Sequence, residues 1–407
     1  MNDRTHSKEN RGEPASNAAF TSTNSPPRMH LVSLVGLMVL VAGFSPGCIS
    51  WHGQSSSSMK ANLSKSYLFK SANRFYPDGV PGNVTNFPQL GPKQKQEIQQ
   101  ELAGLNNSLS TLHSRFHNEL SNYFGGTLKS SFNSRIEVRN TGTPIAHSEP
   151  DGTIIIDVKV AQALFRGSVV DSYTHESVFS AARPLHESAS VNTNGSIEQL
   201  ALKALLKDVE SIRKLKTHFL LGDMVAVLKE DTDAAWFDAA DVAMRSQQIQ
   251  LDYVGTAFFL LAHERGHLAL GHFEKLEQAF GGKDWNDLPE PERQKYCQMR
   301  TDCENQADRY AALLLSTLQV QSQGAMIAFG PDMFGLSGLS GFEAFFNYSY
   351  DYGGFLDAVN AAVCDYPSVK ERLAACSKIN DTIVEEYRKI VSRKLEEELL
   401  KKTNKRR

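Results

Sequence analysis

The strongest constraint on this chain is a pair of histidines at the end of an apolar segment. The run AFFLLA at 257–262 leads directly into HERGH at 263–267. On an α-helix, residues four apart lie on one face, so both imidazoles can reach the same metal ion while Glu264 projects beside them. The chain is therefore expected to bury this helix and to bring a further metal ligand to its histidine face.

The spacing is typical of a catalytic zinc site, with one Zn²⁺ per chain. His263 and His267 are the predicted ligands. Glu264 is the predicted general base, because zinc lowers the pKa of a bound water to about 7 and a carboxylate can then accept its proton. Such a site takes three protein ligands plus water, so a third ligand is needed. The metzincin class is excluded, because Leu270 and Phe273 stand where it has glycine and histidine.

A second acidic motif supplies the third ligand. The sequence ENQAD occupies 304–308 on a segment with a helical pattern, which places Glu304 and Asp308 on one face. Glu304 is the predicted ligand, and Asp308 is predicted to lie behind the ligands and to orient an imidazole through its ring N–H. His272 follows His267 by five residues, about 140° around a helix. It is expected behind the ligands or at the surface rather than on the metal.

Together, HERGHLALGH and ENQADRYA resemble the gluzincin family that includes HtpX, BepA and the CaaX prenyl proteases, in which HExxH is completed by the glutamate of ExxAD. The resemblance implies that His263, His267 and Glu304 bind zinc, that Glu264 is the general base and that Asp308 stands behind the ligands. It also implies a protein or peptide substrate. Cytoplasmic regulatory proteases of the ImmA type and the phage-exclusion protease Lit also join HExxH to a nearby acidic helix and remain an alternative.

Two further segments resemble parts of the same family. YPSVKERL at 366–373 is similar to its HPxxxxR segment, but Tyr366 replaces the usual histidine. Tyr366 is a catalytic candidate that could donate its phenol to the oxyanion; Arg372 could contribute, or both could be structural. Residues 153–165 resemble the strand-then-helix element of gluzincins, in which an edge strand pairs with an extended substrate.

The amino terminus predicts export. Residues 1–30 are polar and include basic groups, and the uncharged apolar run LVSLVGLMVLVAGF follows at 31–44. This run is short for a membrane span and fits the apolar region of a signal peptide. It ends at SPGC, which resembles a bacterial lipoprotein box, so Cys48 is the predicted lipidation site; Ile49 after it resembles sorting to an outer membrane. Cleavage at another small residue, an uncleaved signal anchor and a true start at Met29 remain alternatives.

The net charge and the cysteine count exclude several classes of protein. The formal net charge is −3, so the chain lacks the basic excess of a nucleic-acid-binding protein, and no nucleic-acid partner is predicted. Five cysteines without a CxxC pair exclude a disulfide scaffold and a zinc ribbon. With Cys48 set aside, Cys297, Cys303, Cys364 and Cys376 allow three pairings in an oxidising compartment, or stay reduced.

Hydrophobic periodicity predicts a mainly helical α+β fold. Helices are expected over 98–123, 160–165, 197–221, 254–280, 302–320 and 368–400, and strands over 135–139 and 153–158. The predicted organisation is a signal peptide with a lipobox-like end at 1–48, a flexible tether at 49–92, a helical N-terminal region with a small strand-helix element at 93–230, a gluzincin-type zinc metallopeptidase domain at 231–400 and a basic tail at 401–407. The aromatic-rich segment 329–355 could wall a cleft, touch a membrane or pack in the core.

These features predict a zinc-dependent endopeptidase that hydrolyses peptide bonds in envelope proteins. It is expected to be exported and held at a membrane by a lipid or signal anchor, as an outer-membrane or periplasm-facing lipoprotein. The alternative from another class is a non-catalytic zinc-binding lipoprotein that acts in envelope assembly or as a chaperone. Glu264 favours the enzyme, because a structural zinc site needs a fourth protein ligand rather than a base beside an open position.

Overall fold

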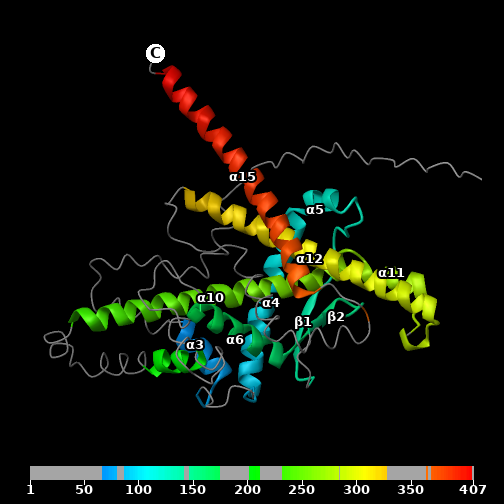
Figure 1. Ribbon diagram of the computed structural model, residues 1–407, viewed down its shortest axis with the longest axis horizontal. Coiled ribbons are helices and arrows are strands. Elements are labelled where there is room, and N and C mark those ends of the chain that lie inside the picture. The colour runs from blue at the N-terminus through cyan, green and yellow to red at the C-terminus, as the bar shows by residue number, and fades with distance from the viewer. Residues whose placement is uncertain are drawn as a thin grey trace, which may run out of the picture. The chain divides into compact units, whose positions relative to one another are not determined.

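The computed structural model describes residues 67–79, 87–141, 146–174, 201–210, 232–283, 285–327, 364 and 368–405 (Figure 1). All of these residues fall in one compact unit, which spans Ser33–Arg407. Their elements are mostly helices, accompanied by one three-stranded sheet. This confirms the α+β, mainly helical class that the sequence predicts.

Three long helices carry the residues of interest (Figure 1). α10 spans Thr232–Ala269, α12 spans Glu290–Ile327 and α15 spans Val369–Lys405. α12 packs against both α10 and α15. All three were predicted, but α10 and α12 begin earlier and α15 ends later than predicted. At the start of α12 the polar sequence EPERQK carries no apolar period.

The helix predicted over 254–280 is interrupted. It divides into the end of α10 and a separate helix, α11 (His272–Phe280). Gly271 lies between the two and adopts a left-handed conformation with φ of 64° and ψ of 38°. Glycine enters this region without steric cost, so the chain can turn there. The single-helix prediction was wrong, because the apolar spacing runs straight through the turn.

The helix predicted over 98–123 is also two helices. α4 spans Pro92–Arg115 and α5 spans His117–Tyr123. Phe116 separates them with φ of −108° and ψ of 18°, which are not α-helical values. Proline in the first turn of α4 agrees with the predicted start of this region, since a missing N–H costs nothing there.

A small sheet lies beside these helices. β1 (Arg135–Arg139) runs parallel to β3 (Thr153–Asp157), and β2 (Ala146–Ser148) runs antiparallel to β3, in the order β1-β3-β2. Both predicted strands are present, and β2 is an additional short one. All five residues of β3 are buried. Because β3 is paired on both sides, the predicted strand-then-helix element at 153–165 does not offer its strand as a free edge to a substrate.

β3 leads directly into α6 (Val158–Thr174), which extends the helix predicted at 160–165. The side chain of Asp157 fixes this junction: Oδ1 accepts a hydrogen bond from the N–H of Lys159 at 2.7 Å. Its Oδ2 accepts from the N–H and the hydroxyl of Thr141 at 2.5 and 2.7 Å. α6 packs against α10, and residues 201–210, within the stretch predicted at 197–221, are helical too.

Part of the predicted tether belongs to the core. Tyr67–Phe75 form helix α3, which packs against α10. The Phe75 ring is fully buried, stacks on Phe165 with a centroid distance of 4.6 Å and meets Tyr253 edge-on at 5.7 Å. The prediction of a flexible tether over all of 49–92 is therefore wrong for this stretch, because nine residues are too few for a helical period to stand out from the sequence.

Residues on both sides of the predicted boundary between 230 and 231 share one hydrophobic core. α10 packs against α3, α4, α6 and the sheet, so the N-terminal elements support the helix that carries HERGH. At the other end, α15 continues to Lys405 and includes most of the predicted basic tail. Within the described part of the chain, no helix has the length and apolar character needed to cross a bilayer.

The four cysteines form one disulfide, which is neither a complete set of two bonds nor four reduced thiols. Cys297 on α12 forms a disulfide with Cys364, whereas Cys303 and Cys376 are buried free thiols. The apolar run at 31–44, the lipidation candidate Cys48 and the aromatic-rich segment at 329–355 lie outside the described residues. The catalytic candidate Tyr366 also lies outside them.

Candidate metal centre

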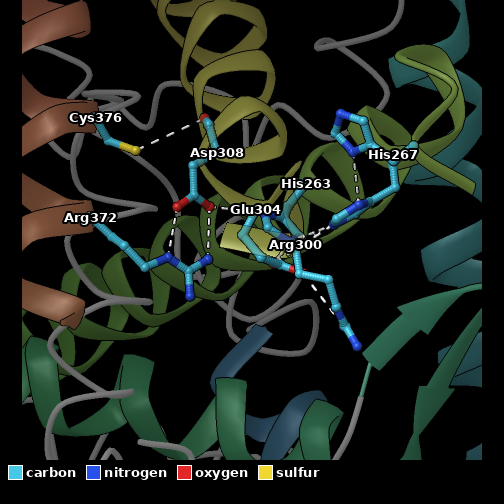
Figure 2. Close-up of polar contacts among 8 residues, drawn as sticks. His263, His267, Arg300, Glu304, Asp308, Arg372 and Cys376 are labelled. Carbon is cyan, nitrogen blue, oxygen red and sulfur yellow. Dashed lines mark hydrogen bonds and ion pairs between the residues drawn. The ribbon is translucent and has the colours of Figure 1, made fainter. Parts of the chain in front are cut away.

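Three side chains on two helices converge on one point. His263 and His267 lie near the end of α10, and Glu304 faces them from α12 (Figure 2). The two Nε2 atoms are 3.2 Å apart, and Glu304 Oε2 lies 3.1 Å from Nε2 of His263 and 3.7 Å from Nε2 of His267. Among the described residues, these three have donor atoms close enough to one another to hold a metal ion.

The donor set and its dimensions suit zinc. In a tetrahedral site with Zn–N and Zn–O bonds of about 2.0–2.1 Å, neighbouring donor atoms are about 3.3–3.4 Å apart. The three observed separations, 3.1, 3.2 and 3.7 Å, lie around this value. Two imidazoles and one carboxylate are also the ligand types and the number that a catalytic zinc takes in addition to water. His263, His267 and Glu304 could thus hold a metal ion.

A contact between two small residues allows the ligand helices to approach. A Cβ atom placed on Gly266 would lie 2.9 Å from Cα of Ala307 and 3.2 Å from its carbonyl oxygen. Ala307 itself is fully buried. Because the side chains at this crossing are minimal, α10 and α12 come close enough for His263 and Glu304, each three residues earlier, to meet. The glycine of HERGH and the alanine of ENQAD therefore have a packing role.

Asp308 and Arg372 lie behind His263. Asp308 Oδ1 is 2.8 Å from His263 Nδ1, so the carboxylate accepts the ring N–H and leaves Nε2 for a metal. Arg372 on α15 donates to both oxygens of Asp308, from Nε at 2.7 Å and from Nη2 at 2.8 Å (Figure 2). Arg372, which the sequence offered as an oxyanion residue or a structural one, is thus bound to Asp308 through a bidentate contact.

Charges shift the pKa values in this part of the site. Burial would raise the pKa of Asp308, but Arg372 and His263 outweigh it and hold that pKa at about 2. Burial likewise opposes ionisation of His263, yet its hydrogen bonds and charge interactions with Asp308 and Glu304 raise its pKa to about 10. The pKa of Glu304 lies well below its ordinary value despite burial, because the two ligand imidazoles hydrogen-bond to it. The carboxylates are therefore ionised, as metal binding requires, whereas His263 is protonated in the metal-free chain and would release its Nε2 proton on binding a metal ion.

His272 lies behind the other ligand, His267. Its Nδ1 is 3.0 Å from Nδ1 of His267, and its Nε2 is 3.3 Å from Oε1 of Gln306 on α12. His272 is 1 % exposed. Burial and the neighbouring His267 lower its pKa to about 3, so the ring is neutral at physiological pH. The structure places His272 behind a ligand, one of the two positions that the sequence left open, and it does so through the turn at Gly271 rather than along a continuous helix.

Glu264 is buried on α10, one residue after His263. Within the described residues, no hydrogen bond or ion pair engages its carboxylate.

The next residue, Arg265, is 1 % exposed and donates from Nη1 to Asn106 Oδ1 at 3.0 Å and to Ser134 Oγ. Its guanidinium lies 4.7 Å from the centre of the Phe132 ring. Arg265 thus anchors the HERGH segment to α4 and to the chain before β1.

Two residues near the site were missed by sequence reasoning. Gln306, inside ENQAD, contacts His272. Arg300 lies one turn before Glu304, with Nη2 3.9 Å from Oε1, the oxygen that does not face the imidazoles. Figure 2 shows Arg300 extending away from Arg372. The spacing Arg-x-x-x-Glu on a helix could have indicated this pair, whereas nothing local predicts the contact of Gln306.

No protein-family model matches this chain, and no curated protein and no solved structure matches it either.

Proposed function

We propose that this protein is a zinc-dependent endopeptidase with a gluzincin-type centre. The observation that carries the proposal is the convergence of His263, His267 and Glu304 beside Glu264, a buried carboxylate with no partner in the described residues. A zinc ion held by the three ligands would polarise a scissile carbonyl and acidify a water. A fourth protein ligand, which a structural zinc would require, is absent from the described residues around this group.

The side chains would divide the work as follows. Glu264 accepts a proton from the attacking water and later returns it to the leaving amine. Asp308, held by Arg372, orients His263, and His272 contacts the far side of His267. Tyr366 remains the candidate for donating to the oxyanion. The roles of Glu264, Asp308 and His272 need side chains in fixed places, and the burial of these three residues supports such roles.

The substrate is proposed to bind as an extended peptide along β2. This strand packs against α10, and its only partner among the described strands is β3, on one side. An extended segment could add to the other side through main-chain hydrogen bonds, which would place a peptide bond beside the helix of the metal centre. This replaces the earlier expectation for residues 153–165, whose strand is central.

We further propose that the protein works in the cell envelope on envelope proteins, as a lipoprotein acylated at Cys48. The disulfide between Cys297 and Cys364 supports an oxidising compartment over the cytoplasm, where the ImmA and Lit types act. Labelling with a radioactive fatty acid should mark the wild type and not Cys48→Ser. Equal labelling of the two, or recovery of both from the cytosol, would contradict the lipoprotein proposal.

The activity is tested on the full chain in detergent, by zinc content and by cleavage of casein. Glu264→Gln should keep the zinc of the wild type and lose activity by about 10² or more, because it removes the general base but not a ligand. Glu277→Gln, an exposed glutamate on α11, is the matched control and should cleave like the wild type. Full activity in Glu264→Gln, or a wild type that binds no zinc, would overturn the proposal; zinc binding with no cleavage by the wild type would favour the assembly factor.

A further inference from the structure

The two ligand imidazoles differ in what stands behind them. His263 contacts a carboxylate that an arginine neutralises, whereas His267 contacts a second imidazole, His272, and through it the amide of Gln306. We propose that Gln306 and His272 form a neutral hydrogen-bond relay that fixes the tautomer of His267 and presents its Nε2 to the metal. The relay rests on the proposed metal centre, and its members are positioning residues.

The direction of the relay follows from the donors and acceptors. The atom of Gln306 that faces His272 is Oε1, which can only accept, so Nε2 of His272 carries the hydrogen and donates across 3.3 Å. A neutral imidazole protonated at Nε2 has its lone pair on Nδ1. That lone pair accepts from Nδ1–H of His267 across 3.0 Å. His267 then has its own lone pair on Nε2, which points at Nε2 of His263 and at Glu304.

The reverse arrangement would disable the ligand. If the amide nitrogen of Gln306 faced His272, every hydrogen in the relay would move to the other ring nitrogen. His267 would then carry its hydrogen on Nε2, the atom that faces His263 and Glu304, and could not bind a metal there. A fixed amide at Gln306 therefore selects the metal-binding tautomer.

The fold holds the relay in place. His272 begins α11 and reaches His267 only because Gly271 turns the chain back at φ of 64°. The two imidazole rings meet edge-on, with centroids 5.0 Å apart and an interplanar angle of 79°. Since His272 is 1 % exposed, water cannot easily replace it as the acceptor for His267.

A neutral relay also preserves the charge of the centre. Asp308 is paired with Arg372, and Glu304, whose second oxygen lies 3.9 Å from Arg300, would be the one anionic ligand of the metal. A carboxylate behind His267 would lower the net charge by one more. An imidazole in that place orients the ligand without weakening the attraction of the metal for a carbonyl oxygen.

Substitutions at Gln306 separate hydrogen bonding from packing. Gln306→Met keeps the length of the side chain but removes the acceptor, and we expect zinc affinity, measured by competition with a chelator, to fall about tenfold or more. Gln306→Glu restores an acceptor and should bind zinc within about threefold of the wild type, by the same reasoning. Gln298→Met, an exposed position on the same helix, is the matched control and should leave affinity unchanged. Thermal unfolding of the metal-free chains checks that all variants fold.

Ring ¹⁵N signals of histidine in the full chain test the relay without relying on activity. His272 should be protonated at Nε2 and His267 at Nδ1, in metal-free and zinc-loaded protein alike. Protonation of His272 at Nδ1 would overturn the relay, as would equal zinc affinity of Gln306→Met and the wild type, or equal losses in the Met and Glu variants. A wild type that binds no zinc but shows these tautomers would instead contradict the proposed function.

Discussion

At the scale of single residues, Arg372 decides whether the acidic group behind His263 can be buried. Asp308 is 3 % exposed, and a buried carboxylate without a partner costs several kcal/mol. Arg372 removes this cost by donating to both of its oxygens. Because Arg372 belongs to α15, this ion pair joins that helix to the metal centre, together with Cys376, whose Sγ lies 3.9 Å from the carbonyl oxygen of Asp308.

Replacing Arg372 by lysine should therefore weaken both stability and metal binding. A lysine keeps the charge but cannot bind both oxygens in a fork, so one charged hydrogen bond is lost at a cost of about 2 kcal/mol. Asp308 would then be held less firmly, and zinc affinity should fall about tenfold. Unfolding in urea measures the first effect, and competition with a chelator measures the second.

Arg393→Lys is the matched control, because it lies in an exposed part of the same helix and donates to the backbone of Lys389. It should change neither quantity. If Arg372→Lys had the stability and the zinc affinity of the wild type, the bidentate contact would have no role in holding Asp308.

At the scale of elements, the crossing of α10 and α12 determines whether the ligands meet. Gly266 sits against the backbone of Ala307, so the crossing distance is set by atoms that cannot rotate away. Gly266→Ala should push the helices apart by a few tenths of an ångström and cost about 1–3 kcal/mol, with weaker zinc binding. Adding Ala307→Gly should restore little, since the closest contact is to Cα rather than to Cβ.

Gly104 on α4 offers the matched control for this prediction. A Cβ atom there meets nothing within 4 Å, so Gly104→Ala should stabilise the chain by up to about 1 kcal/mol. Thermal unfolding and zinc competition on both variants test the pair. If Gly266→Ala stabilised the chain as Gly104→Ala is expected to do, α10 and α12 would not be in contact through Gly266.

Helices and strands also show what the sequence can and cannot predict. Spacing placed His263 and His267 together, because positions four apart on a helix are fixed by local geometry, whereas Glu304, on another helix, was predicted from the ENQAD motif and from the need for a third ligand. The breaks at Phe116 and Gly271 were not predicted, since apolar residues continue on both sides of them.

The relay behind His267 could not be predicted from the sequence, because it depends on tertiary contacts. The contact between Gln306 and His272 depends on the turn at Gly271 and on the crossing of two helices far apart in sequence. The place of β3 at the centre of the sheet depends on β2, a strand of three residues that is too short to show an alternating pattern.

At the scale of the whole molecule, one disulfide joins the helix that carries Glu304 to the chain just before α15. Cys297 lies seven residues, about two turns, before Glu304, and hence on the same side of α12. Cys364 lies eight residues before Arg372. The bond therefore restrains both the segment that supplies the ligand Glu304 and the segment that supplies Arg372, which lies behind the ligand His263. Cys303 and Cys376 are not in a disulfide, and burial raises the pKa of Cys303 to about 11, which keeps its thiol unreactive.

Removing this bond should destabilise the whole molecule rather than one loop. The double variant Cys297→Ser with Cys364→Ser releases a closed loop of 67 residues, for which chain entropy predicts a loss of up to about 4 kcal/mol of unfolding free energy. Zinc should bind more weakly, because Arg372 and Glu304 are then no longer held by a common bond. Gln298→Ser, an exposed position on α12 that leaves the disulfide intact, is the control for zinc binding. Mass spectrometry of the wild type, alkylated after unfolding without reductant, should find Cys303 and Cys376 modified and peptides of Cys297 and Cys364 joined; a bond that includes Cys303 or Cys376 would contradict this arrangement.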